Sequence, residues 1–346
     1  GTTVTITAQI VDVYNNPVST AGKTVTWSKT GAGGSFTSLT SLTSGSGVAT
    51  VGFTTSTGVG TNYTVTATDN TGLAGTSPNI ATIVATAVQY VVSTSNNNPV
   101  AGSAVTITAE LTDVNNNPVA TAGKVVTWSK TGAGGSFGSA TSTTDANGVA
   151  TVVFTTGTFA GTVYAVTATD NTGLTGSSGN ITTVAGLASK YVVSSSDNSP
   201  IAGGTVTITA QLTDANGNSV TTAGKVLTWS KTGSGGSFGA PTSTTNASGM
   251  ATVTLATSSV VGTTHTVTAT DNTALTGTSP NFITVPGSPT KYLVTVSRTN
   301  PVAGDTITVY VQLVDAGNSP RKTPGKVVTW SKTGTGGSFV SPTSTT

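Results

Sequence analysis

The clearest pattern along the chain is a strict alternation of apolar and polar residues over short stretches. In the stretch 104–112, one face would carry Val105, Ile107, Ala109 and Leu111, and the other Thr106, Thr108 and Glu110. A period of two with many β-branched residues is typical of a half-buried strand. The same pattern predicts strands over 124–130 and 149–155, with these residues facing inward: Val126, Trp128, Ala150, Val152 and Phe154.

Further strands complete the unit to which these belong. One begins at Tyr90, another directs Tyr164, Val166 and Ala168 inward, and residues 180–184 close the unit. Clusters of Gly, Pro and Asn predict turns between them, and the glycines of 132–135 predict a loop. Short strands with frequent turns favour a β-sandwich. A closed barrel is the alternative, and it needs strands of more even length.

The whole chain is built from copies of this unit. Its four tryptophans lie 101 residues apart, each in a nearly constant block such as AGKVVTWSKTGAGGSF at 122–137: Trp27, Trp128, Trp229 and Trp330. Tyr90, Tyr191 and Tyr292 follow the same step. Because about 100 residues suffice for an independent domain, each unit is expected to own its core, with the tryptophans as core markers.

The repeat predicts the domain boundaries. We expect a first domain over 1–85 that lacks its first strand, complete domains over 89–185 and 190–286, and the N-terminal part of a fourth over 290–346. Gly1 aligns with Gly102 and Thr346 with Thr43, so the chain is interpreted as a window from a longer repeat protein. The linkers between the units are short, which predicts stiff coupling.

The amino-acid composition argues against several classes of function. Only 7% of residues are charged, against roughly 25% in an ordinary domain. A net charge of +2 is too weak and too scattered to bind nucleic acid. No apolar run is long enough to span a membrane. The chain has no Cys, one His and one Glu, so recurring catalytic groups are missing and neither an enzyme nor a cofactor is expected.

Three motifs resemble a known family. They are Asp-Val-Asn-Asn-Asn-Pro-Val at 113–119, Asp-Ala-Asn-Gly-Val-Ala-Thr at 145–151, and Ala-Gly-Thr followed by Val-Thr-Ala at 160–168. The chain is similar in these motifs, over essentially its whole length, to the bacterial immunoglobulin-like domains of invasin and intimin type. The resemblance implies an all-β protein of tandem Ig-like sandwiches in an extended array. Members are mostly stalks of surface adhesins, and the distal binding domain is not evident here.

One set of recurring carboxylates is a candidate metal site. Each stands just before an Asn- or Gly-rich turn: Asp12, Asp113, Asp214 and Asp315. Oxygens of this kind could bind calcium between domains. The plainer interpretation is an Asx turn, since no second recurring carboxylate stands nearby in sequence. A further set, Asp69, Asp170 and Asp271, could approach the first only across a domain end.

Several other features favour structural roles. The glycine loops after Lys29 and its counterparts lack the helix and lysine of a phosphate loop. His265 stands where Tyr63 and Tyr164 stand and is interpreted as a packing variant. Lys124 and its counterparts are expected to extend to solvent, although some bacterial Ig-like domains join Lys to Asn covalently. The Asn-x-Ser/Thr triplets at Asn62, Asn180 and Asn246 fall at unrelated places in the unit.

The outward faces of the predicted strands are rich in threonine and serine, and this composition bears on function. The chain contains 79 threonines and 39 serines, and threonine suits an exposed strand position. These hydroxyls could also carry O-linked glycans, or form a surface that packs against copies of the chain. The favoured function is a structural repeat region of an extracellular prokaryotic surface protein, forming a self-associating stalk, fibre or surface layer. The alternative is an adhesin repeat that binds carbohydrate, a host receptor or ice.

Overall fold

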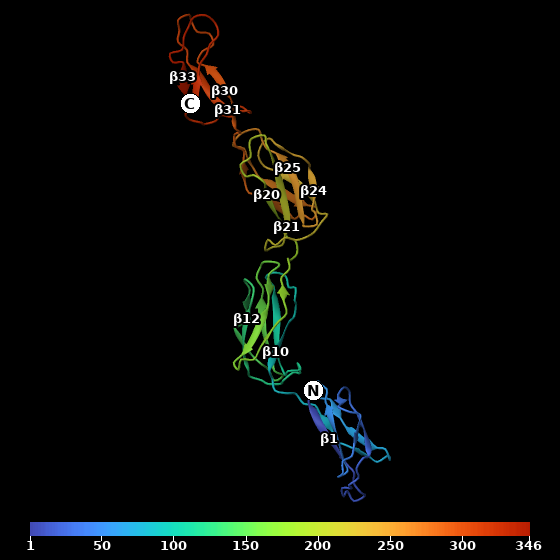
Figure 1. The fold of residues 1–346 in the computed structure, drawn as a ribbon. Helices are drawn as coiled ribbons and strands as arrows, with labels where there is room; N and C mark the ends of the chain where they lie inside the picture. The colour runs from blue at the N-terminus through green and yellow to red at the C-terminus, as the bar shows by residue number, and fades with distance from the viewer. The chain divides into compact units, whose positions relative to one another are not determined.

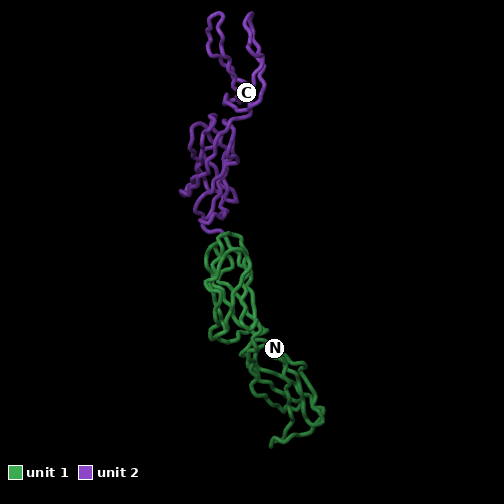
Figure 2. Tube along the Cα trace, turned by 90° about the vertical axis from the view of Figure 1, so that its left-hand side faces the viewer, with its two compact units in different colours: residues 1–184 green, residues 185–346 purple.

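The chain folds entirely into strands and connecting loops (Figure 1). The computed structural model describes residues 1–346. The predicted all-β class is confirmed, and no helix of a length and apolarity suited to crossing a bilayer is present. Two compact units divide the chain, Gly1–Val184 and Ala185–Thr346 (Figure 2). The four finer domain boundaries stay a prediction.

The second repeat shows the fold most completely. Its strands are β10 (Gln89–Thr94), β11 (Ala104–Thr112), β12 (Val125–Lys130), β13 (Ser136–Phe137), β14 (Thr141–Thr143), β15 (Val149–Thr155), β16 (Val163–Tyr164), β17 (Val166–Asp170), β18 (Thr175–Ser177) and β19 (Ile181–Thr182). One sheet has the order β10-β11-β15-β13 and the other β14-β12-β17-β18. A two-stranded ladder of β16 and β19 lies beside them.

The two sheets of this repeat enclose one hydrophobic core. Residues of β11 and β15 pack against residues of β12 and β17, with Ile107, Phe154, Tyr164 and Val166 all fully buried. Every side chain predicted to face inward is buried in the structure, because alternation along a strand places one set of residues between the sheets. The sequence motifs therefore correctly indicated a sandwich of two sheets.

The third repeat has the same sheets. Its strands are β20 (Lys190–Ser195), β21 (Thr205–Thr213), β22 (Val226–Lys231), β23 (Ser237–Phe238), β24 (Thr242–Thr244), β25 (Met250–Ala256), β26 (Thr264–His265), β27 (Val267–Asp271), β28 (Thr276–Thr278) and β29 (Phe282–Ile283). The orders are β20-β21-β25-β23 and β24-β22-β27-β28, with β26 paired to β29. Its core is formed by the corresponding residues.

The first repeat has one strand fewer in its first sheet. Its strands are β1 (Thr3–Gln9), β2 (Thr24–Lys29), β3 (Ser35–Phe36), β4 (Thr40–Leu42), β5 (Val48–Thr54), β6 (Asn62–Tyr63), β7 (Val65–Asp69), β8 (Ala74–Thr76) and β9 (Ile80–Ala81). The sheet orders are β1-β5-β3 and β4-β2-β7-β8. Strand β1 pairs with β5 on one side, and its other edge has no strand beside it.

The last segment forms two hairpin-like pairs. Its strands are β30 (Pro289–Val296), β31 (Val309–Asp315), β32 (Val327–Thr329) and β33 (Thr343–Thr345). Strand β30 pairs with β31, and β32 pairs with β33. All eight residues of β30 are exposed, whereas β10 and β20 each bury their tyrosine. The matching stretches of sequence therefore lie in different surroundings.

Candidate functional site

The recurring aspartates before the Asn-rich turns cap those turns. In the second repeat, Asp113 Oδ1 accepts the backbone N–H groups of Asn115 and Asn117 at 2.8 and 2.9 Å. The side-chain amide of Asn117 donates to Oδ2 at 3.0 Å. Asp12 makes the same bonds with Tyr14 and Asn16. This is the Asx turn that the sequence favoured for these residues.

Three of these aspartates also hold a linker. The other oxygen, Oδ2, accepts a backbone N–H from the linker that precedes the repeat, at 3.2 Å for Ala85 to Asp113. Gly186 donates to Asp214 and Gly287 to Asp315, both at 2.8 Å. Each carboxylate therefore ties the linker to the turn that follows the second strand of the next repeat. The sequence did not reveal this contact, because nothing in composition connects a linker amide to a residue 28 positions later.

The chemistry of Asp113 follows from these bonds. Its pKa is lowered to about 2, first by the side-chain hydrogen bond from Asn117 and then by the N–H groups of Asn117, Ala85 and Asn115, which outweigh burial. Asp113 is only 1% exposed. Four donors surround its two oxygens. The weak calcium candidates Asp12, Asp113, Asp214 and Asp315 all accept hydrogen bonds from their turns, and the last three also accept one from a linker.

The second set of aspartates forms ion pairs with the recurring lysines. Lys124 Nζ lies 3.0 Å from Asp170 Oδ2, and the equivalent distances are 3.1 Å for Lys23 and Asp69 and 3.2 Å for Lys225 and Asp271. The lysine also donates to a threonine hydroxyl, which for Lys124 is that of Thr172. The expectation that these lysines extend to solvent was therefore wrong in geometry. In the first repeat, Asn79 donates its side-chain amide to Asn62.

A tyrosine of the first strand completes this cluster. The Tyr90 hydroxyl donates to Asp170 Oδ2 at 3.3 Å, and Tyr191 donates to Asp271 at 3.2 Å. Burial, together with the nearby Asp170 charge, raises the pKa of Tyr90 to about 12. Burial opposes ionisation of Asp170, but bonds from Thr172 and Lys124 outweigh it and lower the pKa to about 2. All three residue types recur at 101-residue steps, and that shared period was the signal that could have revealed the cluster.

The glycine loops are held by a buried aromatic residue. The Tyr164 hydroxyl donates to the Ala133 carbonyl at 2.8 Å and accepts the Gly157 N–H at 2.9 Å. A side chain at Gly132, where φ is +81°, would collide with the Tyr164 ring. The loop therefore packs onto tyrosine and needs glycine there.

His265 replaces this tyrosine in the third repeat and makes equivalent bonds. It is fully buried, with Nδ1 3.0 Å from the Thr232 carbonyl and Nε2 accepting the Ser258 N–H at 3.3 Å. These partners fit the ring protonated on Nδ1. Both ring nitrogens are engaged by backbone, in keeping with a packing variant of tyrosine.

The four tryptophans differ in burial. Trp27, Trp128 and Trp229 are 3%, 5% and 5% exposed, and Trp330 is half-buried. Each donates its ring N–H to a serine hydroxyl, which for Trp128 is Ser142 at 3.0 Å. The indole polar group is thus satisfied beside the core. Three of these residues lie within the cores of their own repeats.

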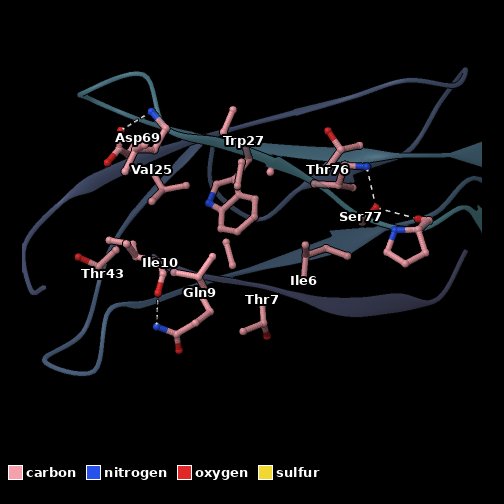
Figure 3. A pocket seen from close by; sticks show the side chains of 18 of the residues that line it. Ile6, Thr7, Gln9, Ile10, Val25, Trp27, Thr43, Asp69, Thr76 and Ser77 are labelled. Atoms are coloured by element: carbon pink, nitrogen blue, oxygen red, sulfur yellow. Dashed lines mark hydrogen bonds between the residues drawn. The ribbon is translucent and has the colours of Figure 1, made fainter. Parts of the chain in front are cut away.

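The first repeat contains a groove beside its core. It encloses about 690 Å³ between β1 on one side and β8 on the other. Figure 3 shows Ile6 and Ile10 pointing from β1 and its extension toward Trp27, while Thr7 and Gln9 point away. Ile6 and Ile10 are half-buried, whereas their counterparts Ile107 and Leu111 are fully buried. The groove is thus an exposed part of the sandwich core.

The corresponding space in the second and third repeats is filled by a strand. Strand β10 pairs with β11 and contacts β18, and β20 does the same with β21 and β28. The Tyr90 carbonyl lies so close to Gly176 that a Cβ there would collide with it, and Tyr191 relates to Gly277 in the same way. Gly75, their counterpart in the first repeat, has nothing within 4 Å of the position of its Cβ. The groove of the first repeat therefore lies where β10 and β20 lie in the second and third repeats.

Comparisons with known proteins find similarity among solved structures. No protein-family model matches the sequence, and no curated protein matches it. Among solved structures, the chain is similar to invasin, a bacterial integrin-binding protein, with 19% identity over 91% of this chain and 73% of that one and a TM-score of 0.36. It is also similar to the Escherichia coli adhesin FdeC, with 21% identity over 82% and 92% and a TM-score of 0.34. The D00-D0 domain of intimin is 21% identical over 56% and 100%, with a TM-score of 0.36. These structural neighbours are bacterial Ig-like adhesin domains of the type that the motifs indicated.

Proposed function

We propose that this chain is a structural repeat region of an extracellular prokaryotic surface protein, which forms a stalk, fibre or surface layer and associates with copies of itself. The observation that carries the proposal is a set of solvent-facing hydroxyl pairs at the same place in three repeats. Thr66 pairs with Thr76 at 3.0 Å, Thr167 with Ser177 at 2.7 Å, and Thr268 with Thr278 at 2.8 Å.

Because of these pairs, the surface can be covered by another protein surface with few hydrogen-bonding groups left without a partner. Each hydroxyl already has a partner on the neighbouring strand, so covering the pair with another surface leaves fewer unsatisfied groups than covering isolated hydroxyls. The face also carries little charge, since the outward residues of β12 and β17 are uncharged: Val125, Thr127, Ser129, Thr167 and Thr169. Nothing electrostatic keeps such faces apart.

Repetition multiplies any contact made by this face. A contact that forms once is offered again 101 residues later, so weak contacts add along neighbouring chains. The linker bonds at Asp113, Asp214 and Asp315 fix each linker to the repeat that follows. Such joints suit a mechanical role. O-linked glycans on exposed threonines are the alternative use of the same hydroxyls.

A ligand-binding repeat has less support. Carbohydrate-type recognition would call for an exposed aromatic residue recurring beside a loop. Phe159 is 75% exposed, but its counterparts are Gly58 and Val260. Tyr14 is 81% exposed, and its counterpart in the second repeat is Asn115. These two exposed aromatic residues therefore do not recur from repeat to repeat.

Two measurements test the proposal. Antibodies against the chain should label intact producing cells as strongly as permeabilised ones, and labelling only after permeabilisation would contradict a surface location.

Light scattering on the unglycosylated chain should show particle mass rising with protein concentration at both low and high salt. The variants Thr167→Lys and Thr268→Lys should reduce that rise, and Thr167→Val and Thr268→Val should not. A strictly monomeric chain at high concentration would leave an isolated stalk as the better description.

A further inference from the structure

We infer that the turn over residues 113–117 is a clamp that restricts the motion of the first repeat against the second, and that its active part is the side-chain amide of Asn117. This amide donates to the backbone carbonyl of Thr57, in the first repeat, at 2.8 Å. The clamp concerns a joint within one chain. It therefore goes beyond self-association and holds whether or not copies of the chain associate.

Both donors of the Asn117 amide are used. Besides the Thr57 carbonyl, the amide binds Asp113, at 3.0 Å from Oδ2 and 3.2 Å from Oδ1. A carboxylate and a carbonyl can only accept, so the amide nitrogen must face both of them. Bonds to an ionised acceptor are the stronger kind, and Asp113 therefore holds the amide in the orientation that reaches Thr57.

Three segments of the chain meet at this one carboxylate. Asp113 is 1% exposed, caps its own turn, and accepts the N–H of Ala85 from the linker at 3.2 Å. Through Asn117 it also holds the first repeat. The linker alone would leave the two repeats joined by a single strand of chain. The contact at Thr57 adds a second point of attachment away from the linker, and two points restrict rotation where one does not.

The loop that carries Thr57 is firmly attached to the first repeat. It connects β5 to β6, and the N–H of Ser56 within it donates to the hydroxyl of Tyr63 at 3.1 Å. Tyr63 is fully buried. On the other side of Thr57, the Gly58 carbonyl accepts the Thr82 hydroxyl at 2.8 Å. A force on the Thr57 carbonyl is thus passed to the body of the first repeat.

The turn is attached to the second repeat with equal firmness. The Asp113 N–H donates to the Asn117 carbonyl at 3.0 Å, and the N–H of Val119 donates to Leu111 at 2.8 Å. Leu111 belongs to the core of the second repeat and is fully buried. Residues 1–184 form one compact unit although the two repeats have separate cores, in keeping with a joint held at more than the linker.

The chain itself shows which substitution removes the clamp and keeps the turn. Ser319 stands in the fourth repeat where Asn117 stands in the second, and its N–H still donates to Asp315 Oδ1 at 2.8 Å. Serine at this position therefore supports the Asx cap. It lacks the amide that could bind an aspartate and a distant carbonyl together. Asn117→Ser is accordingly the variant of choice.

Spin labels can report the motion of the joint directly, because the chain has no cysteine of its own. Labels on Thr40→Cys and Thr141→Cys would occupy the same exposed position in the first and second repeats. Double electron–electron resonance, with labelled chains diluted into excess unlabelled chains, then measures distances within one chain. The parent should give one narrow distance distribution. In Asn117→Ser the fraction outside the main peak should rise by about fivefold, the factor expected for the loss of one ordinary hydrogen bond.

A second variant loosens the clamp from the other repeat. Thr82→Val keeps the shape of the side chain and removes the hydroxyl that donates to Gly58 and accepts the Thr61 N–H. The distance distribution should broaden again, although the second repeat is unchanged. Two controls should match the parent. Asn115→Ala alters the same turn at a residue that takes part only through its backbone N–H, and Asn16→Ser makes the same substitution in the first repeat.

Hydrogen exchange keeps these results interpretable. In Asn117→Ser the amides of β11 and β15 and that of Ala85 should stay protected, since the sheet and the bond from Ala85 to Asp113 remain. If Asn117→Ser unfolded the second repeat instead, Thr82→Val would decide the matter alone. A narrow, parent-like distribution in Thr82→Val, or in a folded Asn117→Ser, would show that the clamp does not restrain the joint. Broadening of equal size in Asn115→Ala or Asn16→Ser would also overturn the inference. None of these results bears on association between copies, which the light-scattering variants test separately.

Discussion

The hydroxyl of Tyr90 donates a hydrogen bond to the carboxylate of Asp170, 80 residues away in sequence and on the opposite sheet of the same sandwich. This bond ties the first strand of the repeat to the end of β17. The same carboxylate holds Lys124 and Thr172, so one buried charge organises groups from three segments. Tyr191 and Asp271 repeat the arrangement in the third repeat.

Tyr90→Phe isolates the contribution of that bond. The ring stays in the core, while the hydroxyl and its bond to a charged acceptor are lost. We expect the free energy of unfolding of the second repeat to fall by about 1.5 kcal/mol, the lower end for bonds to charged groups, because 3.3 Å is long. Hydrogen exchange measured by mass spectrometry checks this, with residues 190–285 of the same molecule as the internal control. Equal loss of protection in both repeats would contradict a local effect.

The ionisation of Asp170 predicts how stability depends on pH. Its folded pKa is lowered from an ordinary 3.8 to about 2, so the folded state favours the charged form. The stabilisation is complete above about pH 5 and is lost as the pH falls from about 4 through 2. In Asp170→Asn that part of the acid sensitivity should disappear, at the cost of lower stability at neutral pH. Unfolding of the second repeat followed from pH 7 to pH 2 tests both statements, and an unchanged acid profile in the variant would refute the assignment.

The strands and the buried residues of the sandwich could be predicted from the sequence, because the alternation of apolar and polar residues within each strand determines which side chains face the core. Alternation placed Ile107, Trp128 and Phe154 correctly, since every second residue of a strand faces the same side. The two-residue strands Ser136–Phe137 and Val163–Tyr164 were not separated from their surroundings, because a pattern of two residues carries no period. The pairing of strands that are distant in sequence could not be predicted either. Lys124 and Asp170 were each noticed, but only the pairing of β12 with β17 brings them together.

The aspartates before the turns show a second limit of sequence reasoning. Their role as Asx caps could be predicted, because the cap is formed within four residues. Their bond to the linker could not, because it depends on where the chain enters the repeat. The open space beside Gly75 became clear only by comparison with Gly176, where the Tyr90 carbonyl occupies the equivalent position.

Trp128→Ala tests the core of the sandwich. The indole is 5% exposed and lies in the same core as Val126 and Ala168, so its removal leaves a large cavity. We expect a loss of about 3–5 kcal/mol, enough to unfold the second repeat preferentially. Limited proteolysis should then cut within residues 89–184 and spare residues 190–285. Trp330→Ala is the matched variant at a half-buried position and should cost much less. Equal losses in the two variants would show that burial between the sheets is not what stabilises Trp128.

Asp113→Asn separates the two roles of the carboxylate at the linker. Asparagine keeps the oxygen that accepts the Asn115 and Asn117 N–H groups, and Asn246 caps a turn in the same way in the third repeat. It places an NH₂ group against the Ala85 N–H, so the linker loses its acceptor while the turn is retained. We expect the Ala85 amide to exchange at least about tenfold faster, a change equivalent to about 1.4 kcal/mol of local opening. Asp12→Asn is the matched control, because Asp12 caps its turn without a linker amide. An Ala85 amide that stayed as protected as in the parent would mean that the linker is held by something other than the carboxylate.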